Sequence, residues 1–313
     1  MKTAVTFLIF NRPDTTEKVF EVIRLARPPK LLVVADGPRA EKPGEAENCA
    51  AARAIIERVD WSCEVLTNYS DVNLGCKLRV SSGLDWVFDT VEEAIILEDD
   101  CLPHPTFFRF CEELLERYRY NERIMTISGN NFQFGHRRTD SSYYFSRYNH
   151  CWGWASWRRA WQHYDIEMKL WSTIREGNWL KDILGDEQAV KYWQAIFQST
   201  YDGVINSWAY RWTFACWIQS GLTILPNVNL VSNIGFSLES THTKRLNKFA
   251  NKFANMPLEA IKFPIQHPQF LIRDIKADVF TQKHHFPNSN PFSFVKTKTK
   301  TFLKEFAFDT LIS

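Results

Sequence analysis

The chain has 313 residues, of which 45 % are hydrophobic and 24 % are charged, a balance typical of a globular protein with a buried core. The formal net charge of +2 excludes a general electrostatic attraction to nucleic acid. The first apolar run stops at Asn11, is too short to span a membrane, and is followed by no small-residue cleavage site. Seven scattered cysteines without a CxxC pair indicate reduced thiols, so we expect a cytoplasmic protein.

The first 130 residues alternate predicted strands and helices. Asp14 and Glu17 form a capping-box pattern at the start of the first helix. This alternation predicts a mainly parallel sheet with right-handed crossovers, an α/β fold. Apolar runs predict strands at residues 5–10, 31–35, 63–67, 94–97 and 124–128, and further helices are expected at 45–58, 77–88 and 105–120.

The second half is rich in tryptophan, with ten of the twelve tryptophans between residues 152 and 217. Helices are expected at 155–164, 188–198 and 210–219, and strands that rejoin the sheet at 222–225 and 229–231. Beyond them, residues 246–313 form a predicted C-terminal extension that either lacks regular structure or packs on the body.

The strongest chemical signal is Glu98-Asp99-Asp100, directly after the fourth predicted strand. Ligands of open parallel sheets bind just beyond the carboxyl ends of strands. Three successive acids there repel one another and lose solvation unless a cation lies among them. Oxygen ligands of this kind suit Mg²⁺ or Mn²⁺. The alternative is a solvated loop whose acids cap the next helix.

Polar residues also follow the other predicted strands. Asn11 and Arg12 follow the first strand and Asp36 the second, and Asn73 and Lys77 lie in a loop that opens a helix. Arginine can face phosphate, and the loop N–H groups with Lys77 can face an anion. Each site alone is explained equally well by turn chemistry; their meeting at one edge of the sheet favours a ligand site.

These motifs resemble the nucleotide-diphospho-sugar transferases of GT-A fold, a Rossmann-like class, with the N-acetylglucosaminyltransferase I type and bacterial polysaccharide glycosyltransferases as the nearest likeness. The resemblance covers about residues 3–245. It implies that Asp100 binds the metal, that Asp99 faces the ribose and that Glu98 supports the nucleotide. The remaining residues that the resemblance places at the base and ribose pocket are Asn11, Arg12, Asp36 and Asn73.

The resemblance also implies a domain division. Residues 1–245 would form one transferase domain, with a nucleotide-binding half at 1–130 and an acceptor-binding half at 131–245. Residues 151–157 are similar to the segment that closes on the donor sugar. Of the tryptophans, we expect Trp154 to line the donor-sugar cleft and Trp152 and Trp208 the acceptor cleft, and most others to be core.

The catalytic base is where the sequence departs from the family. Relatives carry an aspartate after a tryptophan in the segment similar to 206–212, and this chain has Ala209 there. An inverting transferase needs a base for the acceptor hydroxyl. Asp186 and Glu187 are the preferred candidates and Asp202 another; a retaining mechanism would need none.

Two later features complete the expectations. His242 is a candidate second metal ligand, since imidazole suits Mn²⁺, or else a surface histidine. Residues 296–308 mix lysine with phenylalanine, either as a solvated basic tail or as a peripheral contact with the inner face of an anionic membrane.

The expected activity is metal-dependent transfer of a hexosyl or N-acetylhexosaminyl group, by inversion, from a nucleotide diphosphate (UDP favoured) to a glycan or lipid-linked acceptor. The setting would be assembly of a bacterial surface polysaccharide. A sugar-phosphate nucleotidyltransferase is a second interpretation, but residues 10–13 lack the glycine-rich loop typical of that class. The third is a carbohydrate- or nucleotide-sugar-binding protein without catalysis, which Ala209 favours.

Overall fold

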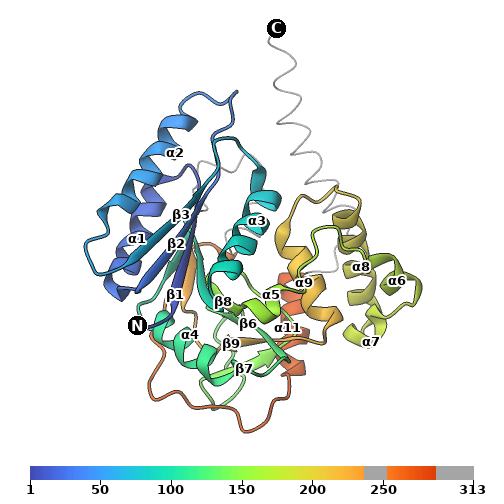
Figure 1. Ribbon diagram of the computed structural model, residues 1–313. Helices are drawn as coiled ribbons and strands as arrows, with labels where there is room; N and C mark the ends of the chain where they lie inside the picture. Colours follow the sequence, from blue (N-terminus) through green and yellow to red (C-terminus); the bar gives the residue numbers. More distant parts are fainter. Residues whose placement is uncertain (236–251, 287–313) are drawn as a thin grey trace.

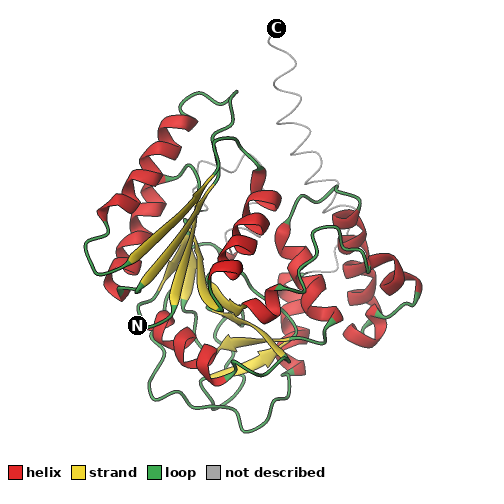
Figure 2. Cartoon of the chain, in the orientation of Figure 1, coloured by secondary structure: helices red, strands yellow, loops and turns green. Residues whose placement is uncertain are grey.

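The computed structural model describes residues 1–235 and 252–286, and its centre is an eight-stranded sheet of order β3-β2-β1-β4-β8-β6-β9-β7 (Figures 1 and 2). Strands β8 and β7 run antiparallel to their neighbours, and the other six run parallel to one another. The predicted α/β class, with a mainly parallel sheet flanked by helices, is thereby confirmed. The strands are β1 (Ala4–Ile9), β2 (Lys30–Ala35), β3 (Glu64–Tyr69), β4 (Glu93–Glu98), β6 (Ile124–Ser128), β7 (Tyr143–Ser146), β8 (Trp154–Trp157) and β9 (Leu222–Pro226). A separate antiparallel pair joins β5 (Cys101–Pro103) to β10 (Val231–Asn233).

Helices cover both faces of the sheet because its central strands are apolar on both sides. In β1, Val5 and Phe7 point into one core while Ala4 and Leu8 point into the other. One face is covered by α1 (Pro13–Ala26), α4 (Thr106–Arg117) and a 3-10 helix (Ile55–Arg58) that extends α2 (Glu45–Ala54). The other is covered by α3 (Gly75–Thr90), with α5 (Arg158–Trp161), α6 (Trp171–Glu176), α7 (Leu180–Leu184), α8 (Glu187–Tyr201) and α9 (Trp208–Ile218) beside it (Figure 1).

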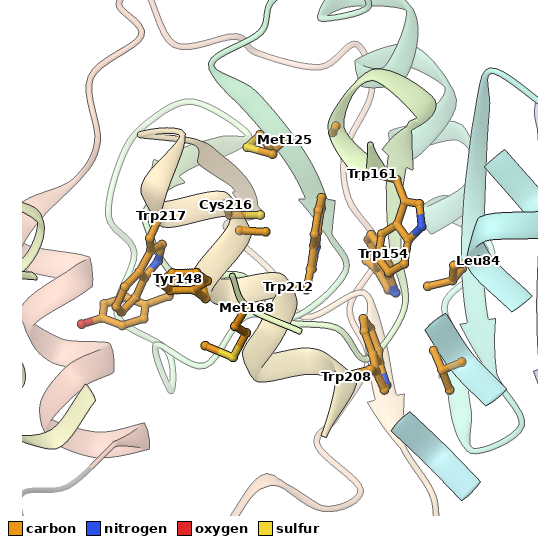
Figure 3. Close-up of a cluster of buried hydrophobic side chains, with 14 of the residues drawn as sticks. Leu84, Met125, Tyr148, Trp154, Trp161, Met168, Trp208, Trp212, Cys216 and Trp217 are labelled. Atoms are coloured by element: carbon orange, nitrogen blue, oxygen red, sulfur yellow. The ribbon is translucent and has the colours of Figure 1, made fainter. Parts of the chain in front are cut away.

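The tryptophan-rich segment is mainly a core. Trp154 on β8 meets Trp208 and Trp212 of α9, with ring centroids 5.8 and 5.9 Å apart (Figure 3). The main sheet therefore carries an aromatic layer that joins it to the helical half. Eight of the ten tryptophans are buried: Trp154, Trp157, Trp161, Trp171, Trp193, Trp208, Trp212 and Trp217.

Several predicted elements are corrected. The first helix begins at Pro13 and not at a capping box, because proline at N1 is preorganised for helix, and Arg12 occupies the N-cap position without a side-chain cap. The helix predicted at 155–164 begins as strand β8, whose backbone pairs with β4 and β6, and only α5 follows. The strand expected at 229–231 pairs with β5 and does not rejoin the main sheet. The boundary placed at residue 245 lies outside the described residues.

The C-terminal helix α11 (Ile275–His285) packs against β7 and was not expected from the sequence. Upstream of it, Ile261 and Ile265 are buried in the core beside α4. Among the described residues, no helix combines the length and the apolar character that crossing a bilayer requires.

His285, the last residue of α11, and the neighbouring His150 predict that the protein loses stability in acid. His150 is 4 % exposed, its ring meets Phe132 at 4.6 Å, and it lies 5.3 Å from the ring of His285. Burial lowers the pKa of His150 well below its usual value, and that of His285 to about 3. The unfolded chain takes up protons near pH 6.5 while the folded chain does not, so stability present above pH 6.5 is lost as the pH falls.

We therefore expect the wild type to lose about 1.4 kcal/mol of unfolding free energy per pH unit below pH 6.5, relative to His150→Gln. Urea denaturation at pH 7.5, 6.0 and 5.0 measures this difference. The exposed His163 provides the control, because His163→Gln should keep a constant offset from the wild type. An equally constant offset for His150→Gln would contradict the prediction.

Candidate functional site

The carboxyl ends of β1, β2 and β4 bring the predicted polar residues to one edge of the sheet. The register pairs Ile9 with Ala35 and Leu8 with Glu98, so the residues that follow these strands are neighbours. A cavity of about 270 Å³ opens there. It is lined by Leu8, Ile9, Phe10, Arg12, Val34, Asp36, Arg39, Asn73, Gly75, Cys76, Arg79, Val80, Glu98 and Asp99. Five of the eight residues predicted to bind the nucleotide sugar, namely Arg12, Asp36, Asn73, Glu98 and Asp99, are therefore in this lining.

Arg12 bridges the two aspartates after β4. Its Nη1 donates to Asp100 Oδ2 at 2.9 Å, and its Nη2 forms an ion pair with Asp99 Oδ1. Asp99 also accepts a hydrogen bond from the backbone N–H of Phe10, at 3.1 Å. The end of β1 is thus tied to the end of β4 through charge-assisted contacts, which are among the stronger hydrogen bonds in proteins.

Arg12 is the guanidinium that pairs with the acids after β4, so one positive charge faces the three successive carboxylates of Glu98, Asp99 and Asp100. Burial raises the pKa of Asp99 to about 6, although Arg12 opposes this. Burial also raises the pKa of Glu98, and the neighbouring Asp100 and Asp99 raise it further. The folded protein would therefore hold these acids more easily in their ionised form if a cation were beside them.

Asp36 organises the loop before α3. Its Oδ1 accepts the N–H groups of Gly37 and Leu74, and its Oδ2 accepts from Gly75 N and Asn73 Nδ2, at 2.9 to 3.1 Å. Both oxygens are engaged, so Asp36 acts here as a positioning residue that holds the loop at the pocket wall. Direct contact of its carboxylate with a base edge, as the sequence predicted, does not fit this geometry.

Glu45 is a site residue that the sequence reading missed. It is 5 % exposed, accepts from Asn11 Nδ2 at 2.8 Å, and pairs with Arg39. Hydrogen bonds from Arg39 lower the pKa of Glu45. Asn11 therefore lies outside the cavity lining and orients Glu45, which in turn holds Arg39 over the Phe10 ring at 6.0 Å.

Arg79 was also missed, although its position on α3 carries a signal. It follows Gly75 by one helical turn and is 6 % exposed, and an arginine this buried is rare unless it is paired. It donates to Ala35 O at 3.1 Å and to Asn68 O and Oδ1 at 2.6 Å. Arg79 thereby joins α3 to the ends of β2 and β3, whereas the predicted Lys77 is not in the cavity lining.

The segment before β8 passes beside the acids. Trp154 pairs with Ile96 in the antiparallel register, and the ladder between β4 and β8 ends at this pair. Burial raises the pKa of Cys151, and the nearby Glu98 raises it further. Trp152 is half-buried, which is compatible with its predicted place at the acceptor.

The structure does not support the predicted sugar contacts of Trp154 and Trp208. They are 0 % and 3 % exposed, and their rings are stacked on each other in the core. An indole without accessible surface cannot stack on a sugar, so we correct both to core residues.

The remaining predicted residues lie apart from the cavity lining or outside the described residues. Asp186 is the N-cap of α8 and accepts from Ala189 N at 2.7 Å, and Glu187 begins that helix. Their predicted catalytic role stays a prediction. His242 lies outside the described residues.

Gly235 closes over the acids from the side of β10. A Cβ at this position would lie 2.4 Å from Asp100 Oδ2 and 2.5 Å from Arg12 Nη1, and Ile234 N donates to Asp100 O at 2.8 Å. The chain therefore approaches the Arg12–Asp100 pair so closely that only glycine fits without movement.

The residues present fit a hard divalent cation that would be held partly by Asp100 and mainly by the phosphate oxygens of a bound molecule. Within residues 1–235 and 252–286, no three His, Cys, Asp or Glu side chains are grouped as a metal-ligand set. Mg²⁺, however, is usually bound through one or two carboxylates together with phosphate oxygens and water. Asp100 and its acidic neighbours supply such oxygens and an excess of negative charge.

Comparison with known proteins gave weak structural likenesses. The sequence matches no protein-family model and no curated protein. Among solved structures, mouse xyloside xylosyltransferase 1 is similar at TM-score 0.40 and 10 % identity, over 86 % of this chain and 100 % of that one. The 4-diphosphocytidyl-2C-methyl-D-erythritol synthase of Anaerococcus prevotii is similar at TM-score 0.31 and 10 % identity, over 59 % and 78 %. A UDP-glucose pyrophosphorylase complexed with UDP-glucose is similar at TM-score 0.26 and 10 % identity, over 51 % and 71 %. TM-scores this low carry no conclusion about the function of this chain.

Proposed function

We propose that the chain is a metal-dependent glycosyltransferase that takes a hexosyl or N-acetylhexosaminyl group from a nucleotide diphosphate, with UDP favoured, and passes it to a glycan or lipid-linked acceptor. The observation that carries the proposal is the cavity at the carboxyl ends of β1, β2 and β4. It gathers cationic, amide and carboxylate side chains from four separate segments at the edge where open α/β sheets bind ligands.

The cavity suits the nucleoside part of the donor. Its volume of about 270 Å³ is near the lower end for small-molecule pockets, and it combines apolar walls with a few polar groups. The ring of Phe10 and the guanidinium of Arg39 offer flat surfaces for a base. The loop that Asp36 holds presents Asn73, and Asp99 would accept a hydrogen bond from a ribose hydroxyl.

The diphosphate would lie over Arg12 and Asp100. In this arrangement Arg12 would donate to phosphate oxygens, and Asp100 would hold Mn²⁺ or Mg²⁺. The cation, when bound, supplies Lewis-acid stabilisation of the charge that develops on the leaving nucleoside diphosphate. Trp152 and Glu98 would then border the space beyond the diphosphate, where sugar and acceptor would meet.

A binding protein without catalysis is the second candidate. The observation in its favour is that Asp186 is engaged as an N-cap and that position 209, where relatives carry the base, is alanine. A binding protein of this kind would bind a nucleotide sugar and leave it intact. Slow hydrolysis or transfer of the bound donor would decide for the transferase.

The testing experiment is a thermal-shift panel of UDP, GDP, CDP and ADP and their sugars, with Mn²⁺ and with chelator. A ligand at about 100 times its Kd adds roughly 2.7 kcal/mol to the unfolding free energy. We expect one nucleotide to raise the melting temperature with Mn²⁺ and to lose most of that shift with chelator. If no nucleotide raises it, the proposal fails.

A further inference from the structure

An ordinary surface helix buries its apolar residues and exposes its polar ones. Helix α11 does the opposite, since most of its buried residues are polar. Its buried residues include Asp278 and Thr281, each 1 % exposed. Its large apolar residues Ile275 and Val279 face outward and are 59 % and 60 % exposed. Four positions apart, they lie on one face of the helix.

The polar face is held inward by specific contacts. Asp278 accepts from Ser146 Oγ at 2.6 Å and pairs with Arg147 and Arg273. Gln282 accepts from Tyr148 and Trp193 at 2.8 and 2.9 Å. Because these buried groups need their partners, the helix cannot rotate to hide its apolar face.

The apolar surface continues into the segment before the helix. Phe270 and Ile272 are 64 % and 71 % exposed. The chain between them and α11 is fixed, since Asp274 N donates to Phe145 O at 2.8 Å. Phe270, Ile272, Ile275 and Val279 are thus four apolar side chains within ten residues of chain, each 59 % exposed or more, and we call this set the ridge.

Cations border this ridge. Lys276 and Lys283 are exposed and lie three positions before and four after Val279, on the same side of the helix. Of the acids on this side of the chain, Asp278 is buried and paired with two arginines, and Asp274 is half-buried and caps the helix by accepting from Ala277 N. Beyond the helix, the sequence adds Lys296, Lys298 and Lys300.

We propose that the ridge of Phe270, Ile272, Ile275 and Val279, with Lys276 and Lys283, docks this protein on an anionic lipid bilayer. Apolar side chains enter the boundary between headgroups and acyl chains, and the lysines pair with the headgroup charges. A second copy of the chain would bring the same lysines face to face. The chain's own tail carries Lys296, Lys298 and Lys300, so its charge would also repel these lysines. Charge complementarity therefore favours an anionic surface over either.

The test is cosedimentation of the full-length protein with vesicles of phosphatidylcholine alone and with about 30 % phosphatidylglycerol. We expect binding to the anionic vesicles only, weakened by salt. Ile275→Ser with Val279→Ser should reduce the partition coefficient about tenfold or more, since each buried methylene contributes to anchoring. Lys276→Gln with Lys283→Gln should reduce it severalfold.

Leu25→Ser is the matched control, because Leu25 is a 75 % exposed leucine on α1. It should bind vesicles like the wild type. A variant with Lys296, Lys298 and Lys300 changed to glutamine separates the tail from the ridge. Wild-type binding by the Ile275→Ser, Val279→Ser variant would overturn the proposal, as would a dimer in light scattering that this variant dissolves. Nucleotide binding in the thermal-shift panel is independent of this outcome, so the two proposals fail separately.

Discussion

Asp100→Ala is expected to abolish the cation-dependent part of nucleotide binding while the protein stays folded. Asp100 is the carboxylate that Gly235 and Arg12 enclose, and its loss removes the oxygens proposed to hold Mn²⁺. Arg12 keeps its partner Asp99, so the tie between β1 and β4 survives. At about 100 times the Kd, the wild type should gain roughly 5 °C in melting temperature from nucleotide with Mn²⁺, and the variant should lose the part of this gain that depends on Mn²⁺.

Asp71→Ala is the control for this result. Asp71 is exposed, lies in the loop after β3 and is not in the cavity lining, so its loss should leave the shift intact. Circular dichroism of both variants establishes that they are folded. An undiminished Mn²⁺-dependent shift in Asp100→Ala would remove the metal assignment.

Trp154→Ala is expected to destabilise the protein by about 3–5 kcal/mol, the cost typical of removing a large aromatic side chain from a core. Trp154 has no exposed surface and contacts Trp161, Trp208 and Trp212. Chemical denaturation at pH 7.5 measures the loss. Trp179→Ala is the matched control, since Trp179 is 49 % exposed and should cost far less.

The same pair of variants separates a core role from a sugar-binding role. A ligand residue would change acceptor binding with little effect on unfolding. If Trp154→Ala kept wild-type stability, the correction of Trp154 to the core would be wrong.

The first half of the fold could be predicted from the sequence because its signals are local. Continuous apolar runs, such as residues 31–35, mark strands buried on both faces, and the acids after β4 stand at a strand end in any parallel sheet. Five of the predicted binding residues therefore lie in one cavity, although the direction of their side chains could not be predicted.

The second half could not be read in the same way because its contacts are distant in sequence. Trp154–Trp157 has the spacing of either a short strand or a helix start, and only pairing with β4, some sixty residues earlier, decides for a strand. Helix α11 buries its polar residues, so a prediction that assigns the apolar residues to the core would choose the wrong face of this helix. Glu45 and Arg79 were missed because their partners, Arg39 and Asn68, become neighbours only after folding.

The loop held by Asp36 bears on affinity through preorganisation. With four donors converging on one carboxylate, residues 73–75 are already in place before any ligand arrives. A ligand at this wall therefore does not have to order the loop, and the entropic cost that weakens binding to flexible loops is largely absent. In the proposed site, Asp36 would contribute to recognition in this way without touching the bound molecule.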